Sequence, residues 1–155
     1  MKNLLQQKFH QFHNAIKLDN PQGRKELTDK RKQLVEALQK ALWMPIKPFD
    51  QGSHAIKTGI CSSNGRDVDV GLEFEFTKNK KDPVELKKEV QQVLKRIAKG
   101  AKSIELKDPC IQVAYKNYHV DFALYAQDPN PNTKSLMLAW GKSPKAKDKG
   151  WISSD

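Results

Sequence analysis

The sequence predicts a single α+β (mixed α/β) domain in which one small mixed sheet is flanked by helices. Three observations predict this class: apolar and polar residues alternate over residues 67–76, a helix start is well marked at Asp82, and a hairpin pattern covers residues 104–125. At 155 residues the chain has the length of one domain, which can bury a full core without disulfides or a structural metal.

Two amphipathic helices are expected before the first strand. Residues 4–17 carry apolar side chains at spacings of three and four, and the turn-forming segment 20–23 is expected to end that helix. Residues 24–42 repeat the pattern, with leucine and valine on one stripe and lysines elsewhere. Pro45 and Pro48 are then expected to break the chain.

The clearest strand covers residues 67–76, where Val, Leu and Phe alternate with Asp, Gly and Glu. The next helix begins with Asp82 as N-cap, Pro83 at the first helical position and Glu85 at the third, a variant of the capping box. Gly100 is placed to end it.

Two strands follow this helix and form a hairpin. The first covers residues 104–115 with an interruption at 108–109, and the second covers 119–125 after a short turn. Beyond them a short apolar segment at 136–140 precedes a lysine-rich stretch at 142–149. The coarse order is therefore two helices, a strand, a helix and a hairpin.

The charge balance favours an anionic partner. The chain has 28 Lys and Arg against 18 Asp and Glu, a net charge of +10, which suits a nucleotide, a nucleic acid or a membrane surface. Its uncharged stretches are too short to span a membrane, and the N-terminus lacks the apolar core of a signal peptide. Two cysteines without metal-binding spacing suit a reducing compartment, so a cytoplasmic location is expected.

Three aspartates stand on strands that are otherwise largely apolar: Asp67 and Asp69 on the first, and Asp121 on the last. Residues i and i+2 of a strand share a face about 6.7 Å apart, so Asp67 and Asp69 can converge on one cation. A carboxylate buried in a sheet needs a cation or a donor, and oxygen ligands select Mg²⁺ or Mn²⁺ over zinc. His119 shares the face of Asp121, where it either hydrogen-bonds a metal ligand or phosphate, or packs in an ordinary way. The alternative is that Asp67 and Asp69 form the solvated face of an edge strand.

The segment before this strand has the composition of a phosphate-binding loop. Gly52 and Ser53 let the backbone approach an anion while amides and a hydroxyl donate to it, and Lys57 and Thr58 add a cation and a second hydroxyl. A Gly-Ser pair alone is weak evidence. Followed by Asp-x-Asp on a strand and a later strand aspartate, it is far more specific.

These three motifs, at 51–58, 66–72 and 119–121, resemble the DNA-polymerase-beta-like nucleotidyltransferase superfamily. Within it, the chain is most similar to the bacterial cGAS/DncV-like nucleotidyltransferases (CD-NTases), over roughly residues 50–125. Members of this family join nucleoside triphosphates into cyclic oligonucleotide second messengers that activate antiphage defence. The resemblance therefore implies a nucleotidyltransferase fold, nucleoside triphosphates such as ATP as substrates, and release of pyrophosphate.

The resemblance also assigns roles to residues. It implies that Asp67, Asp69 and Asp121 are catalytic and hold two Mg²⁺ ions, with Mn²⁺ as a substitute, and that Asp121 helps to deprotonate the incoming ribose hydroxyl. The donor triphosphate would be bound by the preceding loop, whose nucleotide-binding residues are Gln51, Gly52, Ser53, Lys57 and Thr58.

The family further implies how the chain is divided. Residues 1–155 are expected to form one catalytic core, with a helical N-terminal segment at 1–45, the motif-bearing core at 46–128 and a basic segment at 129–155. Relatives continue into a helical C-terminal lobe, so we expect this core to act together with such a lobe or a partner subunit.

Two other functions stay open at this stage. A minimal nucleotidyltransferase could transfer AMP to a protein or RNA acceptor, and a basic module could bind nucleic acid without catalysis. Against the second, three carboxylates at these strand positions would repel phosphates unless metals are bound.

Overall fold

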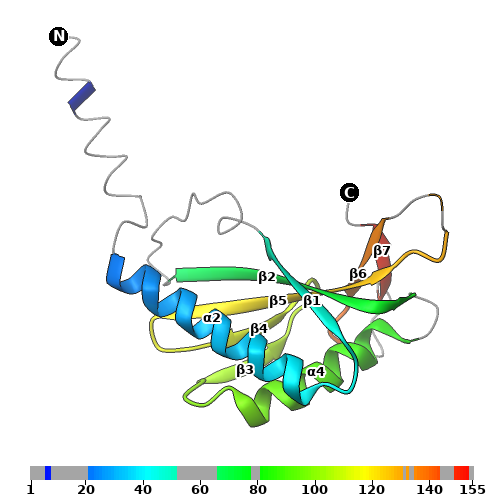
Figure 1. Ribbon diagram of the computed structural model, residues 1–155, viewed down its shortest axis with the longest axis horizontal. Helices are drawn as coiled ribbons and strands as arrows, with labels where there is room; N and C mark the ends of the chain where they lie inside the picture. Colours follow the sequence, from blue (N-terminus) through cyan, green and yellow to red (C-terminus); the bar gives the residue numbers. More distant parts are fainter. Residues whose placement is uncertain are drawn as a thin grey trace.

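The computed structural model describes residues 6–7, 21–51, 66–77, 81–130, 132, 135–143 and 149–153. Its named elements form one mixed sheet with helices packed against it (Figure 1), which confirms the mixed α/β class. In chain order they are α2 (Pro21–Ala41), β1 (Ile46–Gln51), β2 (Arg66–Thr77), α4 (Pro83–Ile97), β3 (Ser103–Leu106), β4 (Ile111–Ala114), β5 (Tyr118–Gln127), β6 (Leu136–Trp140) and β7 (Gly150–Ser153).

The sheet has seven strands and is larger than the small sheet that the sequence pattern predicts. Its main path runs β1-β2-β5-β4-β3, while β6 pairs with β5 and β7 pairs with β6. The pairing of β2 with β5 is parallel and every other pairing is antiparallel. β2 and β5, on which the motif residues lie, are thus both interior strands.

The start of α4 confirms the predicted cap. The carboxylate of Asp82 accepts hydrogen bonds from the amides of Val84 and Glu85, at 2.9 and 3.1 Å. These bonds satisfy two of the amides that an α-helix leaves without partners in its first turn. The helix ends at Ile97, and Gly100 adopts a φ of 83°, a conformation that favours glycine.

The boundary between the first two predicted helices needs correction. α2 begins at Pro21, inside the segment 20–23 that was expected to end an earlier helix, because proline lacks only an amide that the first helical turn leaves unpaired. Of the first predicted helix, 4–17, only Gln6 and Gln7 are described, and both are helical; the rest lies outside the described residues.

The predicted break holds at Pro45, which lies between the end of α2 and the start of β1, and is wrong at Pro48. Residues Ile46–Gln51 form β1, and Pro48 lies within it, opposite Leu72 of β2. Among the described strands β1 lies at the edge of the sheet and pairs only with β2, so its outer side needs no ladder hydrogen bonds from them. A proline is therefore tolerated there.

The later strands agree with the sequence pattern in part. The second hairpin strand appears as β5, but the segment 104–115, predicted as one interrupted strand, forms two antiparallel strands, β3 and β4, because the chain reverses between Leu106 and Ile111. The apolar segment at 136–140 is strand β6, and β7 was not anticipated. Both strands extend the sheet beside the second half of β5.

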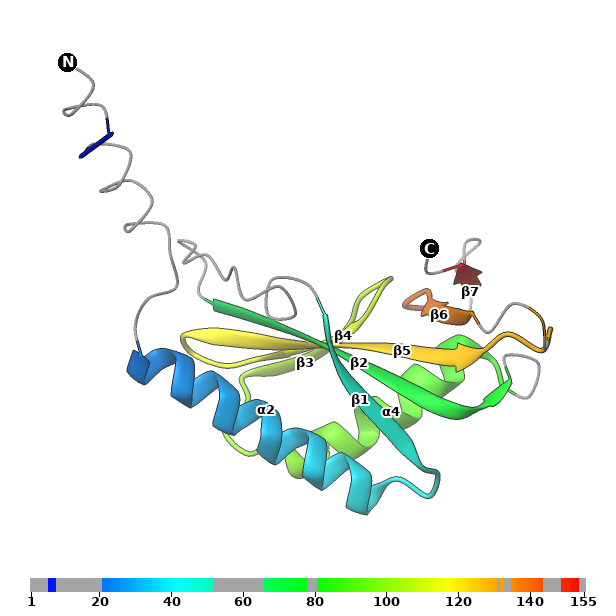
Figure 2. The same ribbon diagram turned by 45° about the horizontal axis from the view of Figure 1, so that its top comes forward.

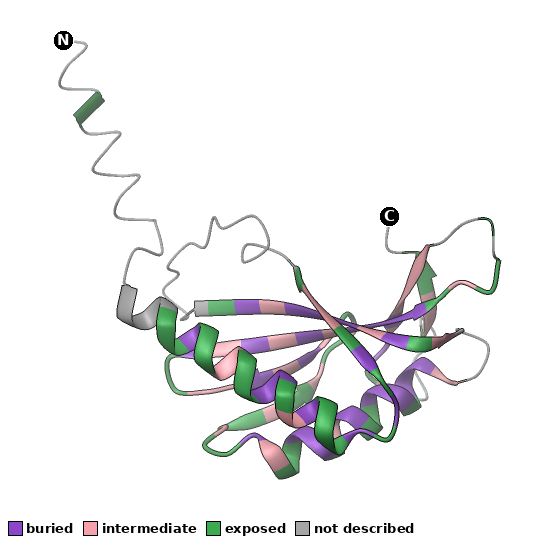
Figure 3. Ribbon diagram, viewed as in Figure 1, coloured by how far each residue is buried: buried purple, intermediate pink, exposed green. Residues whose placement is uncertain are grey.

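The helices α2 and α4 pack on one face of the sheet, as Figures 1 and 2 show together. The side chains between the helices and the sheet are almost fully buried. Along each strand these buried residues alternate with residues of the other face (Figure 3). β2 and β5 contribute the following buried side chains to this core: Val68, Val70, Leu72, Phe74, Val120, Phe122 and Leu124. The opposite face carries the aspartates of β2 and β5 together with apolar and aromatic side chains.

Within the described residues, neither α2 nor α4 is long and apolar enough to cross a membrane.

Candidate active site

The parallel register of β2 and β5 brings the predicted carboxylates together. Asp69 lies beside Asp121, and Asp67 lies beside His119. Neighbouring strands are about 4.8 Å apart, so these four side chains share one small area of the face that the helices do not cover. β2 lies between β1 and β5, so it is not an edge strand as the alternative supposed; among the described residues its pairing with β1 covers Asp69 and does not reach Asp67.

His119 lies between two of these carboxylates. Its Nε2 atom is 2.7 Å from Oδ1 of Asp67, and its Nδ1 atom is 3.2 Å from Oδ1 of Asp121. The Gln112 amide nitrogen lies 3.5 Å from the same Nδ1. Among the described residues, no donor makes a well-formed hydrogen bond with Asp121 Oδ1, although this oxygen is buried.

The pKa values of two aspartates show how crowded the negative charge is. Burial raises the pKa of Asp69, the charge of Asp67 raises it further, and His119 acts in the opposite direction. Burial also raises the pKa of Asp121; Asp69 and Asp67 add to this, while His119 and Gln112 lower it. A cation at this position would remove the cost of holding both groups ionised.

The donor set fits a divalent cation, whereas its present arrangement does not yet form a metal site. Asp67, Asp69 and Asp121 supply the hard oxygen ligands that Mg²⁺ prefers, and within the described part of the chain Asp121 Oδ1 is contacted by His119 Nδ1 at 3.2 Å without a well-formed hydrogen bond. As they stand, the described His, Cys, Asp and Glu side chains form no group of three or more that could hold a metal. Asp67 is instead paired with His119, at 2.7 Å between Oδ1 and Nε2.

A pocket of about 330 Å³ opens beside Asp69 and Asp121. Its other walls come from the start of β4, from β5 and from β6, and the residues are Pro109, Cys110, Ala123, Tyr125 and Leu138. Sequence reasoning did not select any of these five. Tyr125 could have been found, because it continues the alternation that contains Asp121, but Leu138 arrives through strand pairing that no local pattern reveals.

Cys110 is a free thiol in this pocket and is not a nucleophile there. Burial raises its pKa to about 12, and the charge of Asp121 adds to the effect. At neutral pH it is therefore protonated and acts as a small apolar wall residue.

One glycine of β2 is required by a close approach. The ring of Phe49, on β1, lies so near to Gly71 that a Cβ atom there would be 2.3 Å from Phe49 Cζ. The same ring is 5.3 Å, centroid to centroid, from that of Tyr125. Gly71 thus lets an aromatic side chain of the edge strand reach across β2 to a wall of the pocket.

Of the predicted phosphate-binding loop, the structure describes only the first residue, Gln51. Gln51 is the last residue of β1 and its backbone is in register with Asp69, which places the start of the loop beside the carboxylates. Its neighbour Asp50 is held by Arg31 of α2 through an ion pair of 2.6 Å. The other predicted loop residues, Gly52, Ser53, Lys57 and Thr58, lie outside the described residues.

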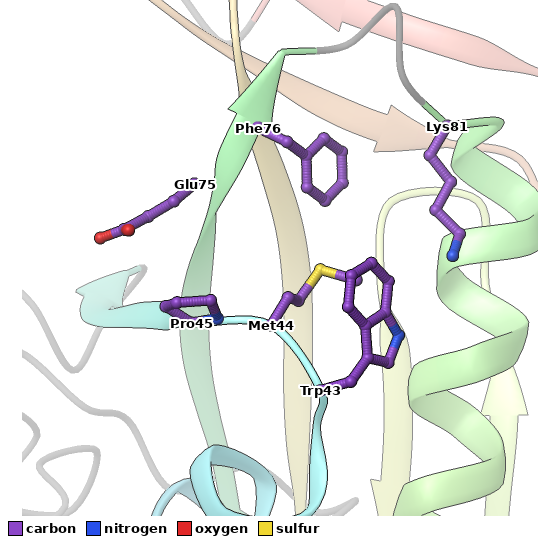
Figure 4. A pocket seen from close by; sticks show the side chains of 6 residues that line it. All are labelled: Trp43, Met44, Pro45, Glu75, Phe76 and Lys81. Atoms are coloured by element: carbon purple, nitrogen blue, oxygen red, sulfur yellow. The ribbon is translucent and has the colours of Figure 1, made fainter.

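A second pocket, of about 310 Å³, lies away from the carboxylates and contains none of them. It is formed where α2 leads into β1, beside the end of β2 and the start of α4 (Figure 4). The Trp43 side chain is 75% exposed there, and the Lys81 ammonium lies 5.2 Å from its ring centroid. The Lys81 ammonium is also paired with Glu89 at 2.5 Å.

Comparison with known proteins gives a family match over the part of the chain that contains the site. Residues 46–125 match the family described as "Cyclic GMP-AMP synthase DncV-like, nucleotidyltransferase domain". No curated protein sequence matched.

Solved structures show the same fold. The CD-NTase CdnG of Bradyrhizobium diazoefficiens in complex with GTP has a TM-score of 0.65 at 19% identity, covering 83% of this chain and 39% of that one. Vibrio cholerae DncV in its GTP-bound form has a TM-score of 0.58 at 20% identity, covering 82% and 37%. DncV with the linear intermediate 5′ pppA(3′,5′)pG has a TM-score of 0.57 at 20% identity, covering 72% and 34%. The chain thus spans well under half of the length of each structure.

Proposed function

Because the chain belongs to the DncV-like nucleotidyltransferase domain family, we propose that it is the catalytic core of an enzyme that joins nucleoside triphosphates and releases pyrophosphate. The observation that supports this most is the alignment of three carboxylates on two adjacent strands, two of which, Asp69 and Asp121, line a pocket. One of them, Asp121, has an oxygen to which no described residue makes a well-formed hydrogen bond. Such a group can accept a proton or ligate a cation.

In the proposed reaction, a ribose hydroxyl oxygen attacks the α-phosphorus of a triphosphate, and the bond from that phosphorus to the pyrophosphate oxygen breaks. Bound Mg²⁺ would neutralise the phosphate charges and the carboxylates of Asp67, Asp69 and Asp121. Asp121 Oδ1 takes the proton of the attacking hydroxyl, a role suited to a carboxylate whose pKa is raised towards the working pH. The pocket beside Asp69 and Asp121 holds the reacting nucleotide.

The substrates follow from the relatives. CdnG and DncV are described in complex with GTP, and DncV with a linear dinucleotide intermediate, so we propose GTP and ATP as substrates and a cyclic oligonucleotide as the final product. The loop after β1, with Gly52, Ser53, Lys57 and Thr58, is proposed to bind the donor triphosphate next to Gln51.

The larger setting is proposed on the same basis. Within one core of residues 1–155, the division expected from the sequence places the motifs in 46–128 and a basic segment in 129–155. A helical lobe or a partner subunit would complete the nucleotide cleft. The product would serve as a second messenger in antiphage defence.

The test is Mg²⁺-dependent nucleotide binding and turnover with matched carboxylate variants. Wild type should bind a non-hydrolysable GTP analogue in the presence of Mg²⁺ and lose most of this affinity in EDTA. Asp69→Asn and Asp121→Asn should lower the affinity for the Mg²⁺ complex at least about tenfold, because each removes a charge that faces the cation. Product formation from α-labelled GTP and ATP should fall in the same variants.

Glu73→Gln is the matched control, since Glu73 lies on the same strand, outside the pocket lining. It should leave both readouts unchanged. Binding that is equal in EDTA, or equal in wild type and Asp121→Asn, would contradict the proposal. Label that ends on a protein or RNA instead of a small product would favour AMP transfer to a macromolecule.

A further inference from the structure

Lys87 on α4 is the buried charged residue of the described core, with a side chain that is 0% exposed. It lies among apolar residues of the helix, on the side that packs against the sheet. Burying an ammonium group is costly unless all of its donors are satisfied. Its surroundings therefore need an explanation.

Three backbone carbonyls satisfy the three donors of this ammonium. Nζ of Lys87 donates to the carbonyl of Lys107 in a short contact, to that of Asp108 at 2.9 Å and to that of Gly141 at 2.6 Å. The first two acceptors belong to the turn between β3 and β4, and the third follows β6. Lys87 thus binds two segments that are far apart in the sequence.

These segments meet at a specific place on β5. The β4 register on β5 reaches Phe122, and the β6 register begins at Tyr125. Two short strands therefore share one side of β5, and their ends meet beside Ala123 and Leu124. The Gly141 amide also donates to the Asp108 carbonyl, at 2.9 Å, across the same junction.

The junction carries one wall of the nucleotide pocket. Pro109 and Cys110 come from the turn that Lys87 binds, and Leu138 comes from β6. All three face the pocket that contains Asp69 and Asp121. Lys87 lies on the helix side of the sheet and does not line the pocket. It affects the pocket wall through the backbone segments whose carbonyls it binds.

We propose that Lys87 is a positioning residue of the nucleotidyltransferase site: its ammonium clamps the β3–β4 turn to the end of β6 and thereby places the pocket wall opposite the catalytic carboxylates. This inference rests on the proposed function. The carboxylates themselves are held by the β2–β5 pairing, which Lys87 does not touch. Its loss should therefore disturb the wall and leave the cation ligands in place.

Burial lowers the pKa of Lys87 to about 8, while Cys110 and Asp108 act in the opposite direction. At neutral pH the group is therefore mostly protonated and keeps its three donors. A methionine at this position would have a similar length and no donor, so it would remove the Lys87 hydrogen bond from all three carbonyls, of which the Asp108 carbonyl would keep the bond from the Gly141 amide.

The experiment compares Lys87→Met with Lys88→Met in the full 155-residue chain, because Lys88 is the exposed neighbour on the same helix. The first readout is amide hydrogen exchange. The Gly141 amide donates to the Asp108 carbonyl, and the Lys107 amide donates to the Cys110 carbonyl within the turn. In Lys87→Met both amides should exchange about tenfold faster, because the backbone around them loses the buried donor that holds it. Amides in the centre of β2 should be unchanged, and Lys88→Met should match wild type throughout.

The second readout separates the wall from the carboxylates. Lys87→Met should weaken binding of a non-hydrolysable GTP analogue with Mg²⁺ about tenfold, while the affinity for Mg²⁺ alone stays within about twofold of wild type. A merely structural role would lower the folded fraction and leave both affinities of the folded protein unchanged. If Lys87→Met does not fold, Lys87→Gln takes its place, because its shorter side chain keeps two donors. It should show the same faster amide exchange and weaker nucleotide binding, with smaller changes in both.

Equal exchange at Gly141 and Lys107 in wild type and in the variants would overturn the clamp. Equal nucleotide affinity would overturn the positioning role. A wild-type chain that binds no nucleotide would overturn the proposed function, and with it the positioning role, while the exchange measurement would still decide whether Lys87 holds the turn.

Discussion

At the scale of one residue, ionisation of the partly buried Asp121 carboxylate lowers the stability of the native state. Its pKa is raised by burial first and by Asp69 and Asp67 as well, so the native state binds this proton more tightly than the unfolded chain does. Below the unfolded pKa of 3.8 the group is neutral in both states. As the pH rises through the raised pKa, the native state must ionise a partly buried group and stability is lost.

Replacement of this carboxylate should therefore stabilise the metal-free protein. In EDTA at pH 7, Asp121→Asn should raise the free energy of unfolding by about 1 kcal/mol, because it removes a partly buried charge. The difference should disappear near pH 3.5, where wild type is protonated. Thermal or urea unfolding at the two pH values measures it, with Asp29→Asn on the exposed side of α2 as control. A destabilised variant at pH 7 would show that Asp121 has stabilising partners.

At the scale of elements, the contact between β1 and β2 connects the edge of the sheet to the pocket. The Phe49 ring fills the space above Gly71 and reaches Tyr125, so the edge strand supports one wall of the site. The pairing of Phe49 with Gly71 in the register makes this a cross-strand interaction, where one residue must be small for the other to be large.

Gly71→Ala should lower the free energy of unfolding by about 1–3 kcal/mol, the usual range for overpacking. The added Cβ would lie 2.3 Å from Phe49 Cζ, and the neighbouring backbone is held in the sheet on both sides. Urea unfolding measures the change. The double variant Gly71→Ala with Phe49→Leu should recover part of it, whereas additive losses would mean that the ring is not the obstacle.

The elements were largely predictable from the sequence, while their pairing was not. Local signals such as the Asp82 cap and the alternation over 67–76 mark a helix start and a strand without help from the rest of the chain. The break expected at Pro48 was wrong because its tolerance depends on lying at the sheet edge, which is a property of the assembled sheet.

The candidate site divides in the same way. Asp67 and Asp69 could be placed on one face from strand geometry, and Asp121 from its own strand. Cys110 and Leu138 reach the pocket because β4 and β6 share β5, and nothing in their neighbours announces this.

At the scale of the whole molecule, the net charge of +10 has a clear use if the ligand is a triphosphate. The site itself is acidic, so a positive surround would draw in nucleotide that the carboxylates alone would repel. Such long-range attraction is screened by salt, because the Debye length shortens from about 10 Å at 0.1 M to about 3 Å at 1 M.

Affinity for GTP with saturating Mg²⁺ should therefore fall severalfold between about 50 and 300 mM salt. Guanosine, which has the same base and no phosphate, is the matched control and should show little change. Calorimetric titration at constant Mg²⁺ measures both. If GTP and guanosine responded alike, the net charge would have no part in binding.

The parallel pairing of β2 and β5 has a consequence for how the protein folds. α4, β3 and β4 all lie between these strands in the chain, so Asp69 and Asp121 become neighbours only after a long loop closes. Contacts of such high sequence separation slow folding, because chain entropy is lost before they form. A nascent or partly folded chain therefore holds these two carboxylates apart until the central pair of strands has closed.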